Sequence, residues 1–463
     1  MNDGKTNLTR TESDSIGVLE VPAGAYYGVQ SLRGAENFHI TGSLMNYQFI
    51  KNITRIKRAG ARVNGKHGYI PLEISKAIVR VCDEILMGEL KDEFITDAVQ
   101  GGAGTSVNMN VNEVIANRAT ELLGGRLGEY ICHPNDHVNC SQSTNDVIPT
   151  AGKLTAIELI KELLGSLDEL IVSFKKKAEE FDGVIKMGRT QLQDAVPVRL
   201  GQEFSAYASA LQRGRRLIAN AVEEMKFVNI GGSAIGTSVN VGKGYLDDIT
   251  LALSEEVGYS LERAEDLIDG TQNVDGFATV SSALRTCAVS LSKICNDLRL
   301  MSSGPKTGLN EIQLPARQNG SSIMPGKVNP VIPEVVSQVA FLVVGNDVTI
   351  AMAVEAGQLE LNAFEPIIFY KLFESLTCLS NAMKTLKVNC VDGIVANEGR
   401  CLELLHSSVG VVTALCPYLG YKKSAEIAKE ALKKNVRVKD LILQYGLMEE
   451  KQLDALLDPY SMT

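Results

Sequence analysis

The stretch LTAIELIKELLGSLDELIVSFKKK, residues 154–177, decides the fold class of this chain. From Leu154 to Phe174, apolar residues recur in it at steps of three and four. That period is typical of one face of an α-helix. The lysines at 175–177 suit a helix C-terminus, where the helix dipole favours cations. The stretch therefore predicts one helix of roughly 25 residues.

Four further stretches carry the same long period, at about 198–227, 274–301, 331–356 and 362–387. Globular helices average about 11–12 residues, so five helices of twice that length indicate an elongated bundle. A helix of 25 residues is about 38 Å long. We expect an all-α fold of three domains. These are a mostly helical N-terminal domain (1–142), a central long-helix bundle (143–397) and a small helical C-terminal domain (398–463).

The composition narrows the class of protein. The chain has 463 residues, is 45% hydrophobic and 22% charged, and carries a net charge of −9. This charge argues against nucleic acid or an anionic membrane as a partner. The polar N-terminus predicts no signal peptide, and Asn346 and Asp347 interrupt the most apolar stretch, 335–356. Nine scattered cysteines without a C-x-x-C pair fit a reducing compartment, so we expect a cytoplasmic protein.

The histidines give little sign of a metal site. There are five, and the one close pair, His133 and His137 in HPNDH, has no matching cluster of ligands elsewhere. We therefore expect a loop held by polar hydrogen bonds at this position, and no bound metal.

A second decisive stretch is GSSIMPGKVNP, residues 320–330. It ends a glycine- and proline-rich connection of nearly thirty residues, and a loop of that length in a compact fold is usually functional. The prolines restrict the backbone, while the glycines let it fold closely over a ligand. We expect a functional loop near 315–330, and the family resemblance described below implies that it is a mobile catalytic lid.

Four clusters of small hydroxyl and amide residues precede expected helices. They are Thr105 with Ser106, Ser143 to Asp146, Thr190 with Gln191, and Asn329 with Pro330. A helix start offers unpaired N–H groups and a positive dipole end, which bind carboxylates. Each cluster taken alone is explained as the cap of its own helix. Four of them, with Lys327 beside the last, favour an anion site.

These clusters resemble the motifs of a known family. GSSIMPGKVNP and the preceding GPKTGLNEI resemble the signature of the fumarase and aspartase superfamily. HPNDHVN, SQSTND, GRTQLQDAVP and GGAGTSVNMNVNEV match further blocks in the same order. The resemblance runs from EVPAGAYYGV at 20–29 into the C-terminal helices. GTSVNMN, STND and GLNEI are similar to the aspartase branch, whereas fumarases tend to have GTQSNMN, SSND and GIGEI or GLGEI.

One position departs from many relatives, which have histidine where this chain has Gln191. A neutral amide can bind a carboxylate or an ammonium group, but it cannot take up a proton at neutral pH. A mechanism that needs histidine at this position is therefore excluded.

The resemblance implies an aspartate ammonia-lyase, which converts L-aspartate reversibly into fumarate and ammonia through an aci-carboxylate intermediate. It implies Ser321, as its alkoxide, as the catalytic base. For the α-carboxylate it implies Lys327, Asn329, Thr190 and Gln191. For the β-carboxylate it implies Thr105, Ser143, Thr144 and Ser322. Asn145, with Thr105 or Thr144, is implied for the amino group.

Two residues remain with open roles. Glu334 lies near the lid in the family, and the alternative is that it stabilises its own helix N-terminus. His133 matches a second-site histidine of fumarases, and the alternative is a surface ligand site. No cofactor is implied, and activation by a divalent cation cannot be read from the sequence.

The resemblance also implies a homotetramer with a central twenty-helix core and active sites that each draw on three subunits. Two other functions stay open: a fumarate hydratase, which uses water as the nucleophile, and a catalytically silent structural homologue.

Overall fold

Helices dominate the computed structural model, which describes residues 8–463. The chain divides into two compact units. The first unit comprises Met1–Leu163, Leu217–Arg285 and Leu342–Cys378, and the second comprises Leu164–Arg216, Thr286–Phe341 and Leu379–Thr463. The three-domain division expected from the sequence stays a prediction.

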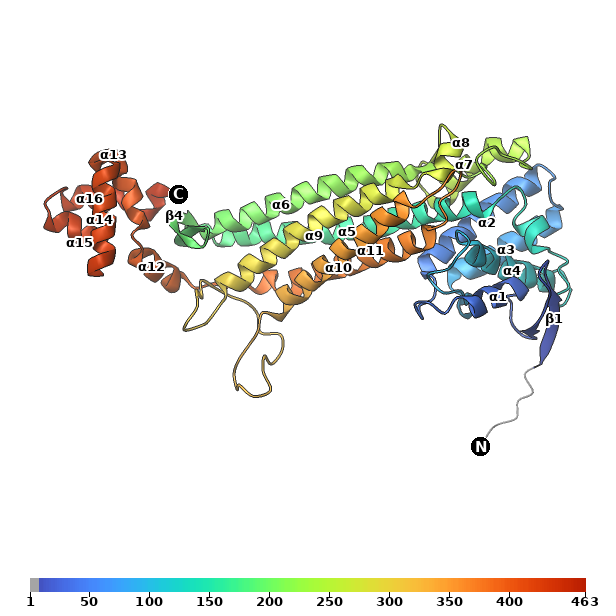
Figure 1. Ribbon diagram of the computed structural model, residues 1–463, viewed down its shortest axis with the longest axis horizontal. Coiled ribbons are helices and arrows are strands. Elements are labelled where there is room, and N and C mark those ends of the chain that lie inside the picture. The colour runs from blue at the N-terminus through green and yellow to red at the C-terminus, as the bar shows by residue number, and fades with distance from the viewer. Residues whose placement is uncertain (1–7) are drawn as a thin grey trace. The chain divides into compact units, whose positions relative to one another are not determined.

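The five longest helices, which are labelled in Figure 1, each contribute residues to both units. They are α5 (Thr144–Glu180), α6 (Leu200–Ala221), α9 (Asp275–Met301), α10 (Val331–Glu355) and α11 (Glu365–Asn389). The all-α fold with five long helices is therefore confirmed. Leu163, Leu167, Leu170 and Phe174 are fully buried, as the period of the opening stretch predicts.

The remaining elements are shorter than these five helices, and the longest of them is α2 with 20 residues. The first unit adds β1 (Thr9–Ser13), β2 (Val18–Pro22), α1 (Val29–Asn37), α2 (Tyr47–Lys66), α3 (Leu72–Met87), η1 (Lys91–Glu93), α4 (Thr105–Leu122), η2 (Pro134–Val138), η3 (Val222–Lys226), β5 (Phe227–Val228), α7 (Lys243–Val257), β6 (Glu262–Arg263) and α8 (Leu267–Gln272). The second unit adds β3 (Ile185–Thr190), β4 (Gln193–Arg199), β7 (Ile312–Gln313), η4 (Val391–Gly393), β8 (Val395–Ala396), α12 (Glu398–Ser407), η5 (Gly410–Leu415), α13 (Cys416–Leu419), α14 (Tyr421–Lys434), α15 (Val438–Gln444), α16 (Glu450–Leu456) and η6 (Pro459–Met462). The strands form four sheets of two strands each within residues 8–463.

Polar side chains in the middle of α10 fix its neighbours in the first unit. Asp347 accepts hydrogen bonds from Ser281 and Arg285 of α9, at 2.7 and 2.8 Å. Asn346 donates to Ser375 of α11 at 3.0 Å. By length and composition, α10 is the one helix within residues 8–463 that could cross a membrane. Its polar pair instead bonds to two partner helices, as expected for a core helix of a bundle.

In the second unit, ion pairs and hydrogen bonds join the other long helices. The two ends of the Arg215 guanidinium on α6 contact the Asp168 carboxylate on α5 at 2.5 and 2.9 Å. The Tyr207 hydroxyl of α6 donates to Asp297 of α9 at 3.0 Å. Aromatic rings then fill the space between α5 and α6. The ion pair and the hydrogen bond require particular partners, in addition to the apolar packing of the rings. They therefore fix which helices are neighbours.

The start of α5 corrects one prediction. The sequence predicted a helix of roughly 25 residues over 154–177, but α5 has 37 residues and begins at Thr144, with Pro149 inside it. Pro149 has no N–H for the carbonyl of Asn145, four residues earlier. The buried side chain of Asn229 replaces that donor and reaches the Asn145 carbonyl at 3.0 Å. The prediction was wrong because the substitute donor comes from a distant segment.

This compensation is testable by thermal unfolding. Asn229→Ala leaves the Asn145 carbonyl unpaired, which should cost about 1–3 kcal/mol and lower the Tm. In a Pro149→Ala background the restored N–H can bond that carbonyl, so the same substitution should lower the Tm clearly less. Equal losses in the two backgrounds would show that Asn229 does not compensate for the proline.

Candidate functional site

Ser143 and Asp146 cap the start of α5 reciprocally. The Asn145 N–H donates to Ser143 Oγ at 3.2 Å, and the Ser143 N–H donates to Asp146 Oδ1 at 2.9 Å. This is the arrangement of a capping box, with aspartate in the place of glutamate. Ser143 Oγ accepts within the helix, so its proton is left for a ligand outside it.

Asp146 also holds the glycine-rich segment 229–236 beside the helix start. Its Oδ2 accepts from the N–H groups of Gly231 and Ser233, both at 3.0 Å. Asn145 Nδ2 donates to the carbonyl of Ala234 at 2.7 Å. That contact leaves Asn145 Oδ1 as the atom that can accept from a ligand. Sequence analysis assigned no role to this segment, although its glycine spacing marked it as a loop.

Thr105 lies close to the same helix start. It is the first residue of α4, after Gly104 in a left-handed conformation with φ of +85°. A Cβ on Gly104 would stand 3.0 Å from Ile148 Cγ2, so the two helix starts approach closely only because this residue is glycine. One turn into α4, Asn108 Nδ2 donates to Thr144 Oγ1 at 3.2 Å. The first unit thus brings Thr105 together with Ser143, Thr144 and Asn145.

Two buried charges lie behind this helix start. Burial raises the pKa of the Asp146 carboxyl to about 6, while its backbone N–H donors and Lys57 oppose the shift. Burial likewise lowers the pKa of the Lys57 ammonium to about 7. In front, the positive ends of α4 and α5 favour an anion. Two hydroxyl donors and one amide acceptor in a row suit a carboxylate with an ammonium group nearby.

The second unit contradicts the expected helix start at Thr190. Thr190 ends β3 and pairs with Gln193, so Gln191 and Leu192 form a two-residue hairpin turn. Their φ angles are +54° and +64°, which is strained for residues other than glycine. Pro197 belongs to β4 rather than to the start of α6. Such strain persists where the surroundings enforce it, commonly at functional sites.

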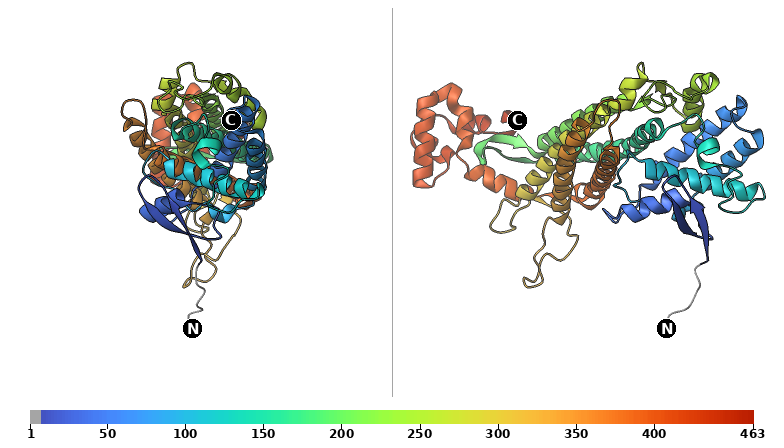
Figure 2. Two further views of the ribbon diagram at one scale, coloured as in Figure 1. Left: turned by 90° about the vertical axis from the view of Figure 1, so that its right-hand side faces the viewer. Right: turned by 45° about the vertical axis from the view of Figure 1, so that its right-hand side comes forward.

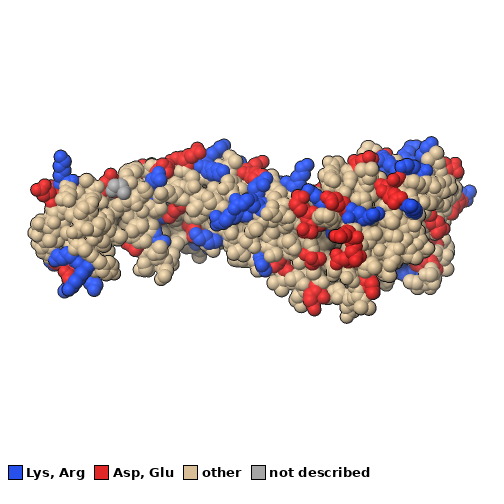
Figure 3. Space-filling view, turned by 90° about the horizontal axis from the view of Figure 1, so that it is seen from above, with Lys and Arg blue, Asp and Glu red and all other residues tan. Residues whose placement is uncertain are grey.

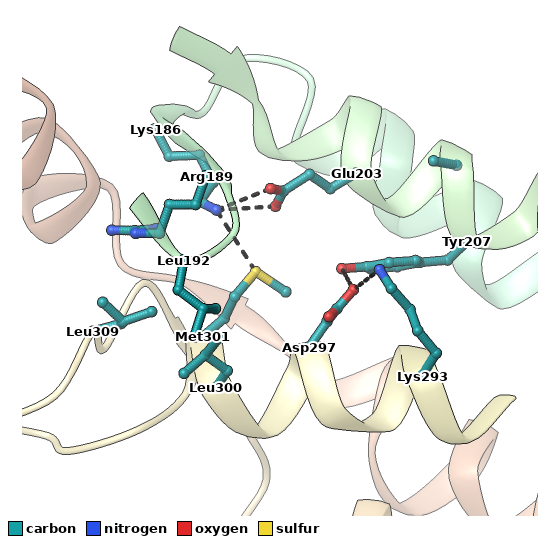
Figure 4. Close-up of a pocket in the computed structure, with 11 residues that line it drawn as sticks. Lys186, Arg189, Leu192, Glu203, Tyr207, Lys293, Asp297, Leu300, Met301 and Leu309 are labelled. Carbon is teal, nitrogen blue, oxygen red and sulfur yellow. Dashed lines mark hydrogen bonds and ion pairs between the residues drawn. The ribbon is translucent and has the colours of Figure 1, made fainter. Parts of the chain in front are cut away.

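Ion pairs support the base of this hairpin, and Figure 4 shows the one between Lys186 and Glu203. Lys186 contacts Glu203 at 3.0 Å and Glu311 at 3.1 Å, and Arg189 contacts Glu311 at 2.8 Å. A cavity of about 270 Å³ lies beside them, lined in part by Arg189 and Leu192. Since Glu311 belongs to GLNEI, its buried carboxylate gives that motif a structural role that sequence analysis missed.

The loop at 320–329 is closed at its neck and open at its tip. Gly320 donates to the Lys327 carbonyl at 2.8 Å, and Asn329 Nδ2 donates to the Gly320 carbonyl at 2.7 Å. A Cβ on Gly320 would stand 2.5 Å from the Lys327 carbonyl oxygen, so the neck requires glycine. The connection extends away from the helices of its unit (Figures 1 and 2).

Ser321 lies just inside that neck. Its Oγ accepts from the N–H groups of Ile323 at 3.2 Å and Met324 at 2.9 Å. Hydrogen bonds to the charged form of a group stabilise that form, so these donors favour negative charge on this oxygen. Ser322 and Lys327 lie exposed on the same loop.

Of the two residues with open roles, Glu334 lies one turn beyond the cluster of Asn329 and Pro330, and its N–H donates to the Pro330 carbonyl at 3.2 Å. Glu334 lies in the first turn of α10, 4.0 Å from Arg299. His133 belongs to the first unit, where its Nδ1 accepts from the Asp136 N–H and caps η2. Over residues 8–463, no three His, Cys, Asp or Glu side chains are grouped as metal ligands would be.

Comparison with known proteins decides the family. Residues 17–345 match the family described as Lyase, and residues 411–463 match the one described as Fumarase C C-terminus. This chain is a member of the lyase family. An aspartate ammonia-lyase from a Bacillus species is 49% identical over 98% of this chain and 97% of its own length. One from Helicobacter pylori strain J99 is 50% identical, with the same coverage.

Solved structures of related proteins agree with the fold of this lyase. The fumarate lyase:delta crystallin of Brucella melitensis bound to cobalt has a TM-score of 0.95 and 47% identity, and the match covers 98% of this chain and 99% of that one. The class II fumarase of Schistosoma mansoni has the same TM-score and coverage at 36% identity.

The capping carboxylate of the lyase gives a pH prediction. Asp146 has a folded-state pKa near 6, above its usual value of about 3.9, so the folded protein binds this proton more readily than the unfolded chain. Its contribution to stability is full below about pH 4 and is lost as pH rises through 6. The stability advantage of wild type over Asp146→Asn should fall by about 1 kcal/mol between pH 5 and 7.5, as measured by denaturant unfolding. An advantage that grows with pH would contradict this assignment.

Proposed function

We propose that this lyase is an aspartate ammonia-lyase, which converts L-aspartate reversibly into fumarate and ammonia. The observation that carries the proposal is the direction of the hydrogen bonds of Ser143, Thr144 and Asn145 at the start of α5. Two hydroxyl oxygens there accept from the protein and one amide nitrogen donates to it. Two donors and one acceptor are therefore left for a substrate that bears a carboxylate and an ammonium group.

The β-carboxylate lies, in this proposal, against the two helix starts. Ser143 and Thr144 donate their hydroxyl protons to it, and Ser322 adds a donor when the loop closes. The Thr105 hydroxyl, which donates to the Gly102 carbonyl at 2.7 Å in this structure, turns its proton to the carboxylate when substrate binds. Removal of the β-proton turns this carboxylate into a dianionic aci-carboxylate. Donors placed where charge develops usually supply the largest share of catalysis. The positive ends of α4 and α5 add to them.

The α-carboxylate is bound, in this proposal, by residues of the second unit. Lys327 provides a positive charge, while Asn329, Thr190 and Gln191 provide neutral donors. Gln191 stands at a strained turn, which fits a side chain held for binding rather than for proton transfer. The amino group meets Asn145 Oδ1, whose direction is set by the contact of Nδ2 with Ala234.

Ser321 is the base in this proposal. Its alkoxide takes the proton from Cβ, and the electron pair of that C–H bond moves into the β-carboxylate. This pair then returns to form the Cα=Cβ double bond of fumarate, while the C–N bond breaks and its own pair leaves with ammonia. Two N–H donors already surround Ser321 Oγ, and Lys327 adds positive charge on the same loop. Closure of the loop would exclude water and strengthen each of these interactions.

The relatives favour this activity over that of a fumarate hydratase. Those named aspartate ammonia-lyase are about half identical to this chain over nearly its whole length, whereas the class II fumarase is 36% identical. We propose further that the reaction needs no resident cofactor. Although the Brucella structure is described as bound to cobalt, each step above is assigned to side chains of this protein.

The outer face of α10 supports an oligomer. Val335, Phe341, Val348 and Met352 are 41 to 69% exposed along one apolar helix. An apolar face of this kind is usually covered by a partner. We propose a homotetramer in which five long helices from each subunit form a twenty-helix core, in the cytoplasm. On the face that Figure 3 shows, acidic and basic side chains are interspersed, which does not favour nucleic acid as a partner.

The length of α5 supports active sites that are shared between subunits. Ser143 to Asp146 lie at the start of this helix, which has 37 residues and a length of about 55 Å, and Thr190 follows its end in the sequence. We propose that each site takes its segments from three subunits, so that clusters remote in one chain meet between neighbours.

The direct test of the activity is the absorbance of fumarate. We expect purified protein to consume fumarate when ammonium is present and not when it is absent. Loss of fumarate without ammonium would indicate a hydratase, and no loss in either case a silent scaffold. Parallel samples with EDTA and with added Mg²⁺ or Co²⁺ test whether a cation is required.

Complementation between inactive variants tests shared sites. Thr190→Ala and Ser321→Ala should each lower kcat, the latter by about 10²–10⁴-fold, the usual contribution of a general base. When the two are refolded together, some sites in mixed tetramers draw both native segments from different chains, so activity should return. Ser408→Ala is the matched control for Ser321→Ala, because Ser408 Oγ also accepts a backbone N–H within a turn. Mixed tetramers that form without regained activity would refute shared sites for this pair.

A further inference from the structure

The hydroxyl of Thr144 is the end of a chain of hydrogen-bonded polar side chains. Thr144 Oγ1 accepts from Asn108 Nδ2 at 3.2 Å, and the same nitrogen lies 3.4 Å from Asn139 Oδ1. Lys57 Nζ donates to that oxygen at 2.8 Å. The four residues come from α5, α4, the segment after η2 and α2, all within the first unit. Lys57 is completely buried and Asn108 is 1% exposed.

The far end of this chain fixes the direction of its hydrogen bonds. The Lys57 ammonium only donates, so Asn139 presents its oxygen to Lys57 whenever this lysine is charged. Independently, Asn139 Nδ2 donates to the Gln142 carbonyl at 3.2 Å, and a carbonyl only accepts. Asn112 Nδ2 also donates to Asn139 Oδ1, at 3.2 Å. The amide of Asn139 therefore has one allowed orientation.

The orientation of Asn139 then determines how the Asn108 amide is turned and where the Thr144 hydroxyl directs its proton. Because Asn139 presents an oxygen, Asn108 must present its NH₂ group, and that group also reaches Thr144 Oγ1. A hydroxyl has one proton and two acceptor positions, so an oxygen that accepts from Asn108 directs its proton elsewhere. In residues 8–463 this oxygen has no other recorded hydrogen-bond partner, which leaves the proton for a ligand in front of α5.

We propose that Asn108 is a positioning residue, which orients the Thr144 hydroxyl through the chain Lys57–Asn139–Asn108 so that its proton is donated to the substrate carboxylate. The inference rests on the proposed function, in which Thr144 binds the β-carboxylate. Asn108 acts only through Thr144 and does not touch the substrate. Its loss frees the hydroxyl to rotate and weakens a hydrogen bond to the carboxylate that strengthens in the transition state.

A matched pair of substitutions separates this role from simple support of the fold. Asn108→Asp replaces the NH₂ group by an acceptor, which turns the Thr144 proton inward. Asn112→Asp places the same charge one turn further along α4, against the same Asn139 oxygen. We expect Asn108→Asp to lower kcat/KM for aspartate about 10- to 100-fold, mainly through kcat. The control should lower kcat/KM only a few-fold, although both variants should lose thermal stability. Equal losses of kcat/KM would overturn the proposal.

A double-mutant cycle gives the decisive measurement. Asn108→Leu should lower kcat/KM about 10-fold or more in wild type and hardly at all in a Thr144→Val background, where no hydroxyl remains to be oriented. Equal effects in the two backgrounds would refute the inference.

A second pair of variants covers the case in which Asn108 variants do not fold. Asn139→Asp keeps an acceptor that faces Asn108 and should retain activity within a few-fold of wild type, whereas Asn139→Leu should lose it about 10-fold or more. Similar activity in these two variants would also refute the proposal that hydrogen bonds through Asn139 and Asn108 orient Thr144. Wild type without ammonium-dependent activity would instead refute the proposed function. Active wild type without coupling would refute only the positioning role.

Discussion

The buried carboxylate of Asp146 joins the chain segments on which the proposed substrate site depends. One oxygen caps α5 through the Ser143 N–H, and the other holds the N–H groups of Gly231 and Ser233. Beside them, the Asn145 N–H bonds to Ser143 Oγ, and Asn145 Nδ2 bonds to the Ala234 carbonyl in the segment that Asp146 holds. Asn108 orients Thr144 in the proposed chain. A buried carboxylate is costly unless it accepts several hydrogen bonds. The same network that satisfies Asp146 therefore also fixes which atoms of the helix start can meet a ligand.

The two halves of the proposed machinery differ in rigidity. The start of α5 is fixed by buried groups such as Asp146, Asn229 and Lys57, each bonded to another segment. The loop with Ser321 is exposed, and its hydrogen bonds are local, across its own neck and turn. Few buried contacts make local opening easy. This difference suits a reaction in which a fixed site binds the carboxylate and a movable segment brings the base and then releases the product.

Local patterns in the sequence predicted what local physics controls. The helical period gave the five long helices, and small polar residues before apolar runs gave the helix starts at Thr105 and Ser143. Thr190 was misassigned because a strained two-residue turn of Gln191 and Leu192 lacks the usual Asn-Gly signal. The role of Asn229 could not be predicted, since it depends on contacts between segments far apart in the chain. The direction of the Thr144 hydroxyl proton could not be predicted either, since it depends on Lys57, almost ninety residues away in the sequence.

The central claim is that the start of α5 holds a substrate carboxylate through oriented hydroxyl groups. Equilibrium binding of succinate, a dicarboxylate that cannot react, tests it without any chemical step. Measured by calorimetry at fixed salt, the Kd of Thr144→Val should be about 10-fold or more above that of wild type, the loss expected for one hydrogen bond to a charged group. An unchanged Kd in a correctly folded variant would contradict the account.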